Sequence, residues 1–376
     1  MFSGIMMSIP IKTKTMRYKL LLLILAASLP AGIICGQAFS EKKIYREVMP
    51  VNSETSLEID NKYGTIQITS WNKDSVEIRA EVEAFSSDLD RLRRLFQGVN
   101  VNISGSSYLV RGYTSFTQNI SMLFESFKGL TSKLIPYESR LHINYYIKAP
   151  EYIDMRITNK YGDVYMESNK AKLTLNLSNG AFKANALNEA YGMELVFCDA
   201  TVNKLTKGRL NTSFSEVEID ESADLSITSI SSKFNLENTV SVNVESRRDE
   251  FFIGKISSLK GNSYFSDLRI EEVGKELNMV LKYGDLDAEF ISKGIEMVTL
   301  NSAYTDISLA FDKSVSYNLD IRHLNAFLVL PDDDARLEKK VVNEVKKEYM
   351  TFGTVGRNPG NVKVVIDATR GNIYLK

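Results

Sequence analysis

Six acidic residues occupy the same place in a recurring short motif, one residue after a turn-like position. They are Asp163, Glu216, Glu250, Asp267, Asp285 and Asp306. Clustered carboxylates suit Ca²⁺, and they also accept hydrogen bonds from a basic or polyhydroxylated ligand. Two like charges about 5 Å apart in water repel by only about 1 kcal/mol, so a solvated row of acids without a ligand is the simpler interpretation. We expect no cofactor, with Ca²⁺ as the alternative.

The other chemistry-bearing residues indicate no catalytic centre. His142 and His323 are the two histidines of the chain, and each is expected to be solvated rather than a ligand or base. Cys198 follows Phe197 in an apolar stretch, which favours a packed thiol over a nucleophile. The sequence lacks CxxC, HExxH, GxSxG and phosphate-binding glycine motifs. The usual zinc, serine-hydrolase and nucleotide sites are therefore excluded.

The acids belong to an internal repeat, first visible in the copies NKYGTI at 61–66, NKYGDV at 159–164 and LKYGDL at 281–286. Alignment of all copies places the turn at Gly64, Gly162, Gly180, Ala200, Ser215, Ser232, Asp249, Ser266, Gly284, Thr305, Asn325 and Gly371. The second and fourth residues after each turn are apolar, with Lys204 as the exception. Alternating apolar residues predict strands with one buried face, not helices. Rungs of about 17 to 20 residues predict an all-β, single-stranded parallel β-solenoid, right-handed by the usual crossover preference.

The corners of such a stack explain the motif without a ligand. Glycine tolerates positive φ, and Asn, Asp and Ser bond to nearby backbone, so these residues favour tight turns. Ser and Thr also recur three places before the turn, where their hydroxyl groups are expected to bond between adjacent rungs. These residues are Thr212, Ser229, Ser246, Ser263 and Ser302.

Residues 1–38 have the pattern of a secretory signal peptide. An apolar run from Leu20 to Cys35, short for a membrane span, follows four basic residues, namely Lys12, Lys14, Arg17 and Lys19. Small residues at Gly36 and Ala38 suit cleavage, whereas Ile34 before Cys35 argues against a lipoprotein. We expect an exported protein of the periplasm or the cell surface.

The composition of the mature chain restricts its partners and its source of stability. Without the leader, 42 basic residues face 47 acidic ones, and Cys198 is the remaining cysteine. A mild acidic excess without a basic block argues against nucleic acid or an anionic membrane surface as partner. Because one cysteine cannot form an intramolecular disulfide, a buried core must stabilise the fold.

Capping regions are expected on both sides of the repeats, which span 151–330. The N-terminal α/β cap, 39–150, has predicted strands and a short helix that starts near Ser86 or Ser87. The C-terminal cap, 331–376, has a predicted helix over about 335–349, followed by a final strand pair. The helix prediction rests on the spacing of Leu337, Val341, Val342, Val345 and Tyr349.

An apolar stripe at helical spacing lies between two predicted strands of the N-terminal cap. It consists of Ile120, Leu123, Phe124, Phe127 and Leu134. Packing against the first rung is the main interpretation. The alternative is contact with a partner or a lipid surface through 116–135, since exposed apolar stripes mark binding.

The stretches LEIDNKYGTIQITSWNKDSVEIRAEV and YYIKAPEYIDMRITNKYGDVYM, followed by degenerate β repeats, resemble the putative-adhesin β-solenoid family of unknown function. The family is typical of exported proteins of Bacteroidota, and the similarity covers most of the mature chain. The resemblance implies an envelope-associated solenoid of adhesin type. It carries over no catalytic residue, because the matching positions are corners and core.

Two classes of function fit these observations. The favoured one is a non-catalytic cell-envelope protein, with a repetitive surface that acts as an adhesin-like or scaffold module for an envelope or host glycan, a protein or another copy of itself. The alternative is a carbohydrate-active enzyme, a polysaccharide lyase or glycosidase on a parallel β-helix. Such an enzyme needs paired carboxylates or a Lys or Arg base gathered on one face. Here the acids follow a corner and the basic residues are scattered.

Overall fold

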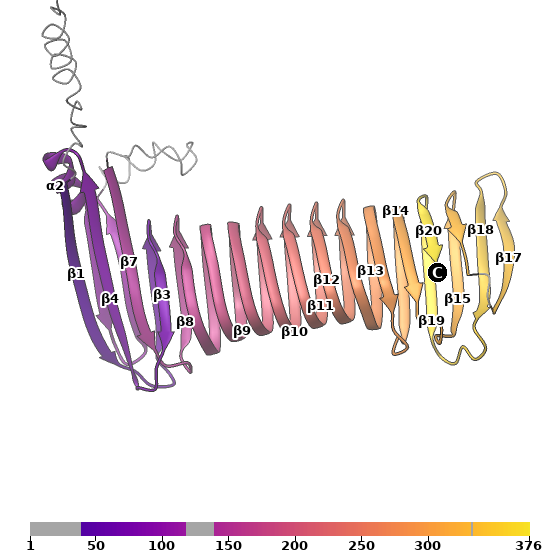
Figure 1. The fold of residues 1–376 in the computed structure, drawn as a ribbon, viewed down its shortest axis with the longest axis horizontal. Coiled ribbons are helices and arrows are strands. Elements are labelled where there is room, and N and C mark those ends of the chain that lie inside the picture. The colour runs from indigo at the N-terminus through magenta and orange to yellow at the C-terminus, as the bar shows by residue number, and fades with distance from the viewer. Residues whose placement is uncertain (1–38, 118–138, 332–333) are drawn as a thin grey trace, which may run out of the picture.

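The computed structural model describes residues 39–117, 139–331 and 334–376. Its strands form one long, mostly parallel sheet drawn out along a single axis (Figure 1). The predicted all-β, solenoid-like architecture is confirmed. In chain order the elements are β1 (Phe39–Pro50), β2 (Ser56–Lys62), β3 (Ile66–Ser70), β4 (Ser75–Ser86), α2 (Leu89–Gln97), β5 (Val99–Gly105), β6 (Leu109–Phe116), β7 (Ser139–Ala149), β8 (Asp154–Lys160), β9 (Val164–Ser213), β10 (Glu216–Ile230), β11 (Lys233–Arg247), β12 (Glu250–Tyr264), β13 (Asp267–Ile291), β14 (Met297–Phe311), β15 (Tyr317–Leu324), β16 (Phe327–Val329), β17 (Ala335–Asn343), β18 (Glu348–Val355), β19 (Lys363–Thr369) and β20 (Asn372–Leu375).

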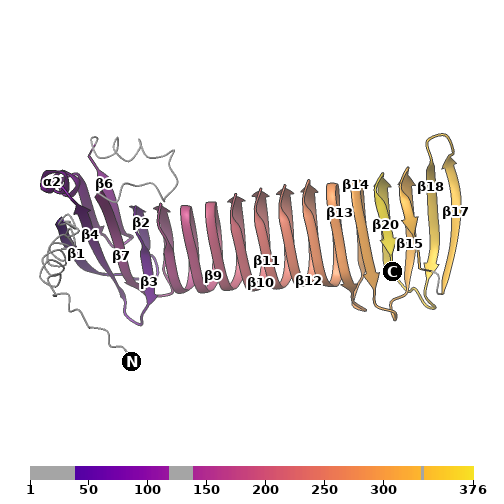
Figure 2. The ribbon, with the colours of Figure 1, turned by 45° about the horizontal axis from the view of Figure 1, so that its top comes forward.

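The central rungs pair in parallel with their sequence neighbours, as Figure 2 shows for β9 to β14. The apolar residue that starts each rung lies beside its equivalent in the next, so that Val217, Phe234, Phe251 and Leu268 form one column. All four are at most 2% exposed. A single elongated core therefore runs through the stack, because every second residue of each strand points inward.

The repeated NKYG motif marks two rungs in direct contact. Strands β2 and β8 pair in parallel with Asn61 beside Asn159, and β3 pairs with the start of β9. The two buried asparagines donate side-chain hydrogen bonds to the carbonyl oxygens of Ile143 and Gly64, over 2.8 and 2.9 Å. The two copies are far apart in the sequence because most of the N-terminal cap, from β4 to β7, lies between them in the chain.

The register corrects two turn positions. Ala200 pairs with Val217, so the residue equivalent to Ser215 is Cys198. Phe327 pairs with Asn372, so the residue equivalent to Gly371 is Ala326, not Asn325. The sequence alignment was shifted by two residues here because Cys198, Ala200 and Val202 all face inward and are all apolar.

The C-terminal cap contains no helix over 335–349, so this prediction was wrong. The segment forms an antiparallel hairpin in which Val341 of β17 pairs with Tyr349 of β18. Strand β18 also pairs with β15, and β19 inserts between β14 and β15 as an extra parallel partner. Strand pairing satisfies the backbone groups at the end of the stack, and this requirement outweighs the helical spacing of the side chains.

The predicted helix of the N-terminal cap is confirmed as α2, with Asp88 as its N-cap; its carboxylate accepts a hydrogen bond from Arg91 N at 2.7 Å. Within the described residues, no helix is both long and apolar enough to span a membrane. The predicted signal peptide and the apolar stripe from Ile120 to Leu134 lie outside the described residues.

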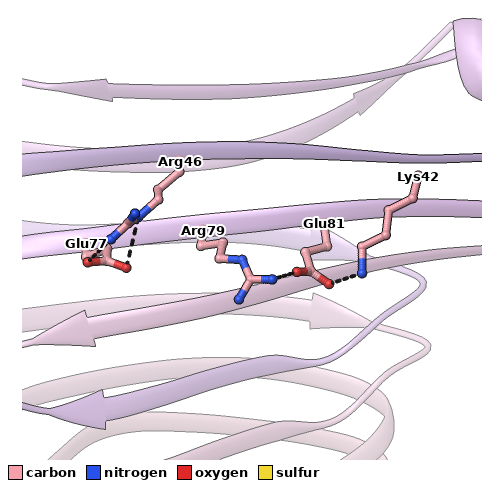
Figure 3. Close-up of polar contacts among 5 residues, drawn as sticks. All are labelled: Lys42, Arg46, Glu77, Arg79 and Glu81. Carbon is pink, nitrogen blue, oxygen red and sulfur yellow. Dashed lines mark hydrogen bonds and ion pairs between the residues drawn. The ribbon is translucent and has the colours of Figure 1, made fainter.

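The terminal strands β1 and β17 lie at opposite ends of the stack (Figure 1). On β1, Arg46 bonds to Glu77 of β4 over 3.2 Å, and Glu81 lies between Lys42 and Arg79 (Figure 3). Strand β17 likewise carries basic residues, among them Lys339 and Lys340. Charged side chains on an end strand hinder its pairing with a further strand.

Candidate ligand-binding corner

One corner of the stack repeats the same backbone conformation in every rung. The residue before each turn position adopts the left-handed region, with φ between 49° and 66°. These residues are Tyr63, Tyr161, Asn179, Phe197, Phe214, Ser231, Arg248, Phe265, Tyr283, Tyr304, Asn325 and Arg370. Positive φ was expected at the turn glycines and is found at Gly284 and Gly371. Gly162 has a different role: a Cβ there would lie 2.0 Å from Gly64 O. Close approach between rungs requires this glycine.

The left-handed residue is aromatic in most corners, and its ring points outward. The rings of Tyr63 and Tyr161 stack at 5.5 Å between centroids, and those of Phe197 and Phe214 at 5.0 Å. Tyr283 stacks on Phe265 at 4.7 Å and on Tyr304 at 5.1 Å. We call this set the aromatic ladder; it comprises Tyr63, Tyr161, Phe197, Phe214, Phe265, Tyr283 and Tyr304.

The aromatic ladder is not required by the turn. Left-handed conformation costs an ordinary side chain about 1 to 2 kcal/mol, whereas Asn adopts it easily. Asn179 and Asn325 show that Asn is accommodated at this corner. Stacking of one pair of rings stabilises the fold by only about 0.5 to 1.5 kcal/mol. Because Phe197, Phe214 and Phe265 are 52 to 56% exposed, burial does not explain their aromatic side chains either.

The predicted acidic row runs beside this ladder, two residues further along each rung. Asp267, Asp285 and Asp306 lie on successive rungs, as expected. Asp163 is separated from this group, and Lys233 lies between Glu216 and Glu250. The sequence alignment missed Asp199, which pairs with Glu216, because of the slipped turn at Cys198.

Several of these acids bond to the backbone of the next rung. Asp163 accepts a hydrogen bond from Ala181 N at 2.8 Å, and Asp267 accepts one from Asp285 N at 3.1 Å. Asp306 accepts one from Asn372 N at 2.8 Å. Glu250 instead forms an ion pair with Lys233 at 2.9 Å. These contacts are a structural reason for carboxylates in the column.

The electrostatics of the acidic row give no preformed cation site. Partial burial, and then the charges of Asp267 and Asp306, raise the pKa of Asp285. Among the residues that the structure describes, no group of three or more His, Cys, Asp or Glu side chains is arranged to hold a metal ion. Calcium binding therefore stays a prediction from the sequence, without support from this geometry.

A shallow groove adjoins the corner on rungs of β3 and β9. It has a volume of about 290 Å³. Its outward-facing lining includes Gln67, Tyr165, Glu167, Lys183, Asn185, Thr201 and Asn203. Asn203 donates a hydrogen bond to Asn185 at 3.0 Å, and Tyr165 donates one to Asp163 at 3.1 Å. The surface beside the corner is thus rich in neutral hydrogen-bonding groups.

The inward side of the corner is a column of small polar residues. Ser215 Oγ donates to Ser213 O at 2.9 Å and to Leu195 O at 3.3 Å. The Cys198 thiol makes the equivalent contacts with Val196 O and Leu177 O, both at 3.3 Å. Burial raises the pKa of this thiol. The predicted packed thiol is confirmed, and its role is that of a corner serine.

The predicted hydrogen bonds between rungs form at some of the serines and threonines that lie three places before the turn, but not at all of them. Ser246 Oγ bonds to Ser263 Oγ of the next rung at 3.3 Å, and Ser229 Oγ donates to Asp249 at 2.6 Å. Thr212 Oγ1 and Ser302 Oγ, by contrast, are buried without a hydrogen-bond partner in the described part of the chain.

The two histidines differ from each other. His142 is exposed beside the ring of Phe85, as expected. The expectation of a solvated His323 was wrong, because β18 and β19 both pair with β15 and leave this side chain 4% exposed. Its ring lies 5.5 Å from that of Tyr349, and burial lowers its pKa. The two side chains lie on β7 and β15, toward opposite ends of the stack, and form no common site.

Asp249 is an acid in the buried serine column. Its carboxylate accepts hydrogen bonds from Ser229 Oγ, from Ser232 N at 2.7 Å and from Arg247 N at 2.9 Å. Burial nevertheless dominates and raises the pKa of this carboxyl group. The folded protein thus holds the proton more tightly than the unfolded chain, in which the pKa is about 3.9.

Replacement of Asp249 with serine should stabilise the protein at pH 7. Above about pH 4 the unfolded chain releases this proton first, so the wild type loses stability until the folded pKa is passed. A serine at position 249 can form the hydrogen bonds that Ser215 and Ser232 form at the equivalent corners, and it does not ionise. Thermal melting of both proteins from pH 4 to pH 8 measures the effect: the advantage of Asp249→Ser should grow with pH. A constant difference would contradict it.

Sequence comparisons give no relative for this chain: no family model matches it, and no curated protein matches it. Among the solved structures that match, two align with 89% of the chain. One, described as a putative cell adhesion protein from Clostridium sporogenes, has 13% identity and a TM-score of 0.20 over 100% of its length. The other, a putative adhesin from Bacteroides fragilis, has 10% identity and a TM-score of 0.27 over 98% of its length. Values this low place the chain in no family.

Proposed function

We propose that the protein is a non-catalytic, adhesin-like binding module of the cell envelope that recognises a saccharide chain along the aromatic corner. The observation that carries the proposal is the outward-facing aromatic ladder, which neither the turn nor burial requires. Export by the N-terminal leader to the periplasm or the cell surface is part of the same proposal. The ligand is an envelope or host glycan.

The chemistry of the corner suits a sugar. The C–H groups on one face of a pyranose ring carry partial positive charge, which complements the negative face of an aromatic ring. Sugar hydroxyl groups donate hydrogen bonds to carboxylates, and Asp199 and Asp285 lie exposed two residues from Phe197 and Tyr283. The rungs repeat about every 4.8 Å, so a polymer can meet equivalent groups repeatedly along the stack.

Catalysis is the less favoured interpretation of the same residues. Carboxyl groups on neighbouring rungs approach the separation of about 5 Å found in retaining glycosidases, and the pKa of Asp285 is raised as an acid catalyst requires. Asp285 lies on the exposed surface of the corner, however, and Asp267 and Asp306 are engaged with backbone amides. Release of reducing ends from bound glycans that stops in Asp285→Asn would favour the enzyme.

Removal of ladder rings tests the binding proposal. The variant Phe197→Asn/Phe265→Asn keeps a residue that suits positive φ, so stability should change by only about 1 kcal/mol. Binding to an array of oligosaccharides, followed by calorimetry on the hits, should weaken at least tenfold.

The matched control is Tyr191→Asn. Tyr191 is 54% exposed but lies away from the corner, between Lys172 and Arg209. This variant should bind as the wild type does. An array without any hit, or equal losses in both variants, would refute saccharide binding at the corner.

A further inference from the structure

The aromatic ladder is interrupted at Asn179, between Tyr161 and Phe197. Neighbouring rings of the ladder lie 4.7 to 5.5 Å apart. One ring is missing here, so the planes of Tyr161 and Phe197 are separated by two rungs, about 10 Å. A flat ring placed midway would lie at the stacking distance from both. We call the space above Asn179 the ring slot.

The rings of Tyr161 and Phe197 form the two walls of the ring slot. Each ring has one stacked face and one face toward the slot. Tyr161 stacks on Tyr63 and Phe197 stacks on Phe214, in both cases on the side away from Asn179. The two walls are 40% and 56% exposed. Folding therefore uses one face of each ring and leaves the faces toward the slot for a ligand.

Polar groups surround the ring slot on the same rungs. Asn179 itself is exposed, and Asp163 and Asp199 flank it two residues after the walls. Asp199 is exposed, whereas Asp163 is half-buried and accepts hydrogen bonds from Ala181 N and from the Tyr165 hydroxyl group. The groove lined by Tyr165, Lys183, Asn185, Thr201 and Asn203 follows on the same strands. Stacking faces, carboxylates and a polar groove thus adjoin one another.

We propose that the ring slot binds the terminal pyranose of a neutral oligosaccharide, with the following sugars in the groove. The slot admits one ring end-on, which selects a chain end rather than the middle of a polymer. The groove combines neutral hydrogen-bonding groups with one acid, Glu167, and one base, Lys183, so that their charges balance. The carboxylates beside the slot oppose an acidic terminal sugar. This inference rests on the proposed function and names its ligand class and subsite.

The second interruption of the ladder, at Ser231 and Arg248, fits a sugar less well. It spans three rung spacings, about 14 Å, so a single ring cannot contact both walls. Its polar column is occupied by the ion pair between Lys233 and Glu250 at 2.9 Å. Only the slot at Asn179 combines a one-ring spacing with an adjoining groove.

Filling the slot tests the inference without unfolding the protein. Tyrosine already occupies equivalent corners at Tyr161 and Tyr283, so Asn179→Tyr should complete the stack and leave the melting temperature equal or higher. Calorimetry with the neutral trisaccharides that bind best on the array should show at least a tenfold weaker affinity. The control, Asn325→Tyr, makes the same change at a corner far along the stack and should bind normally.

The outcomes separate the inference from the proposed function. If Phe197→Asn/Phe265→Asn abolishes binding but Asn179→Tyr does not, the corner binds saccharides and the ring slot is wrong. Exclusive binding of acidic glycans, or of polymers without accessible ends, would also overturn the slot. Saturation-transfer NMR should place the terminal ring protons closest to the protein, and signals spread evenly over the chain would contradict end recognition. A silent array would overturn both.

Discussion

Substitution of Gly162 with alanine should destabilise the protein by about 3 kcal/mol or more. The added Cβ would lie 2.0 Å from Gly64 O and 2.7 Å from Gly64 C, both backbone atoms of the preceding rung. A flexible side chain could move aside, but here two hydrogen-bonded rungs would have to separate. Urea unfolding followed by circular dichroism should show a large drop in the midpoint for the Gly162→Ala protein.

The matched control is Gly192→Ala in β9, the long strand that follows Gly162. A Cβ at Gly192 meets no atom within 4 Å. Alanine there should leave stability unchanged or raise it by about 0.4 to 1 kcal/mol, because it reduces the freedom of the unfolded chain. Equal effects of the two substitutions would show that the corners do not approach as closely as the stacked rungs require.

Truncation of Phe251 to alanine should cost about 3 to 5 kcal/mol. Its side chain is 2% exposed, and its ring stacks on that of Phe234 at 4.7 Å inside the stack. Loss of the ring leaves a cavity between rungs that Leu268 on the next rung cannot fill without displacing the backbone. The denaturant midpoint measures this loss.

Phe252 provides the comparison within the same dipeptide. It faces outward, is 46% exposed and contacts the guanidinium of Arg269. Its replacement by alanine should cost about 1 kcal/mol or less. If both variants lost similar stability, the alternation of buried and exposed residues along β12 would be refuted.

The strands and the parallel stack could be predicted from the repeat of apolar residues. In so short a unit, apolar residues at every second position fit a strand and not a helix. The helix α2 was also predictable, since its capping signal is local. The hairpin of β17 and β18 was not. Side chains such as Leu337 and Val341 fit a helix, and only the unpaired backbone of β15 at the end of the stack decides for strands.

The candidate site was predictable in its chemistry and not in its geometry. The sequence indicated the acidic row, but not that Asp163 and Asp306 bond to backbone amides, because those partners come from other rungs. The aromatic residues before each turn, as in KYG, were a visible signal of the ladder. Their outward direction follows from the left-handed corner.

The repeat, the inward-facing residues and the absence of common catalytic motifs can all be read from the amino-acid sequence. Tertiary structure decided which corners are neighbours, and so which rings stack and where a ring is missing. The physical reason is that strand identity depends on local alternation of side chains. Contacts between rungs depend on register, which hydrogen bonds between distant segments fix.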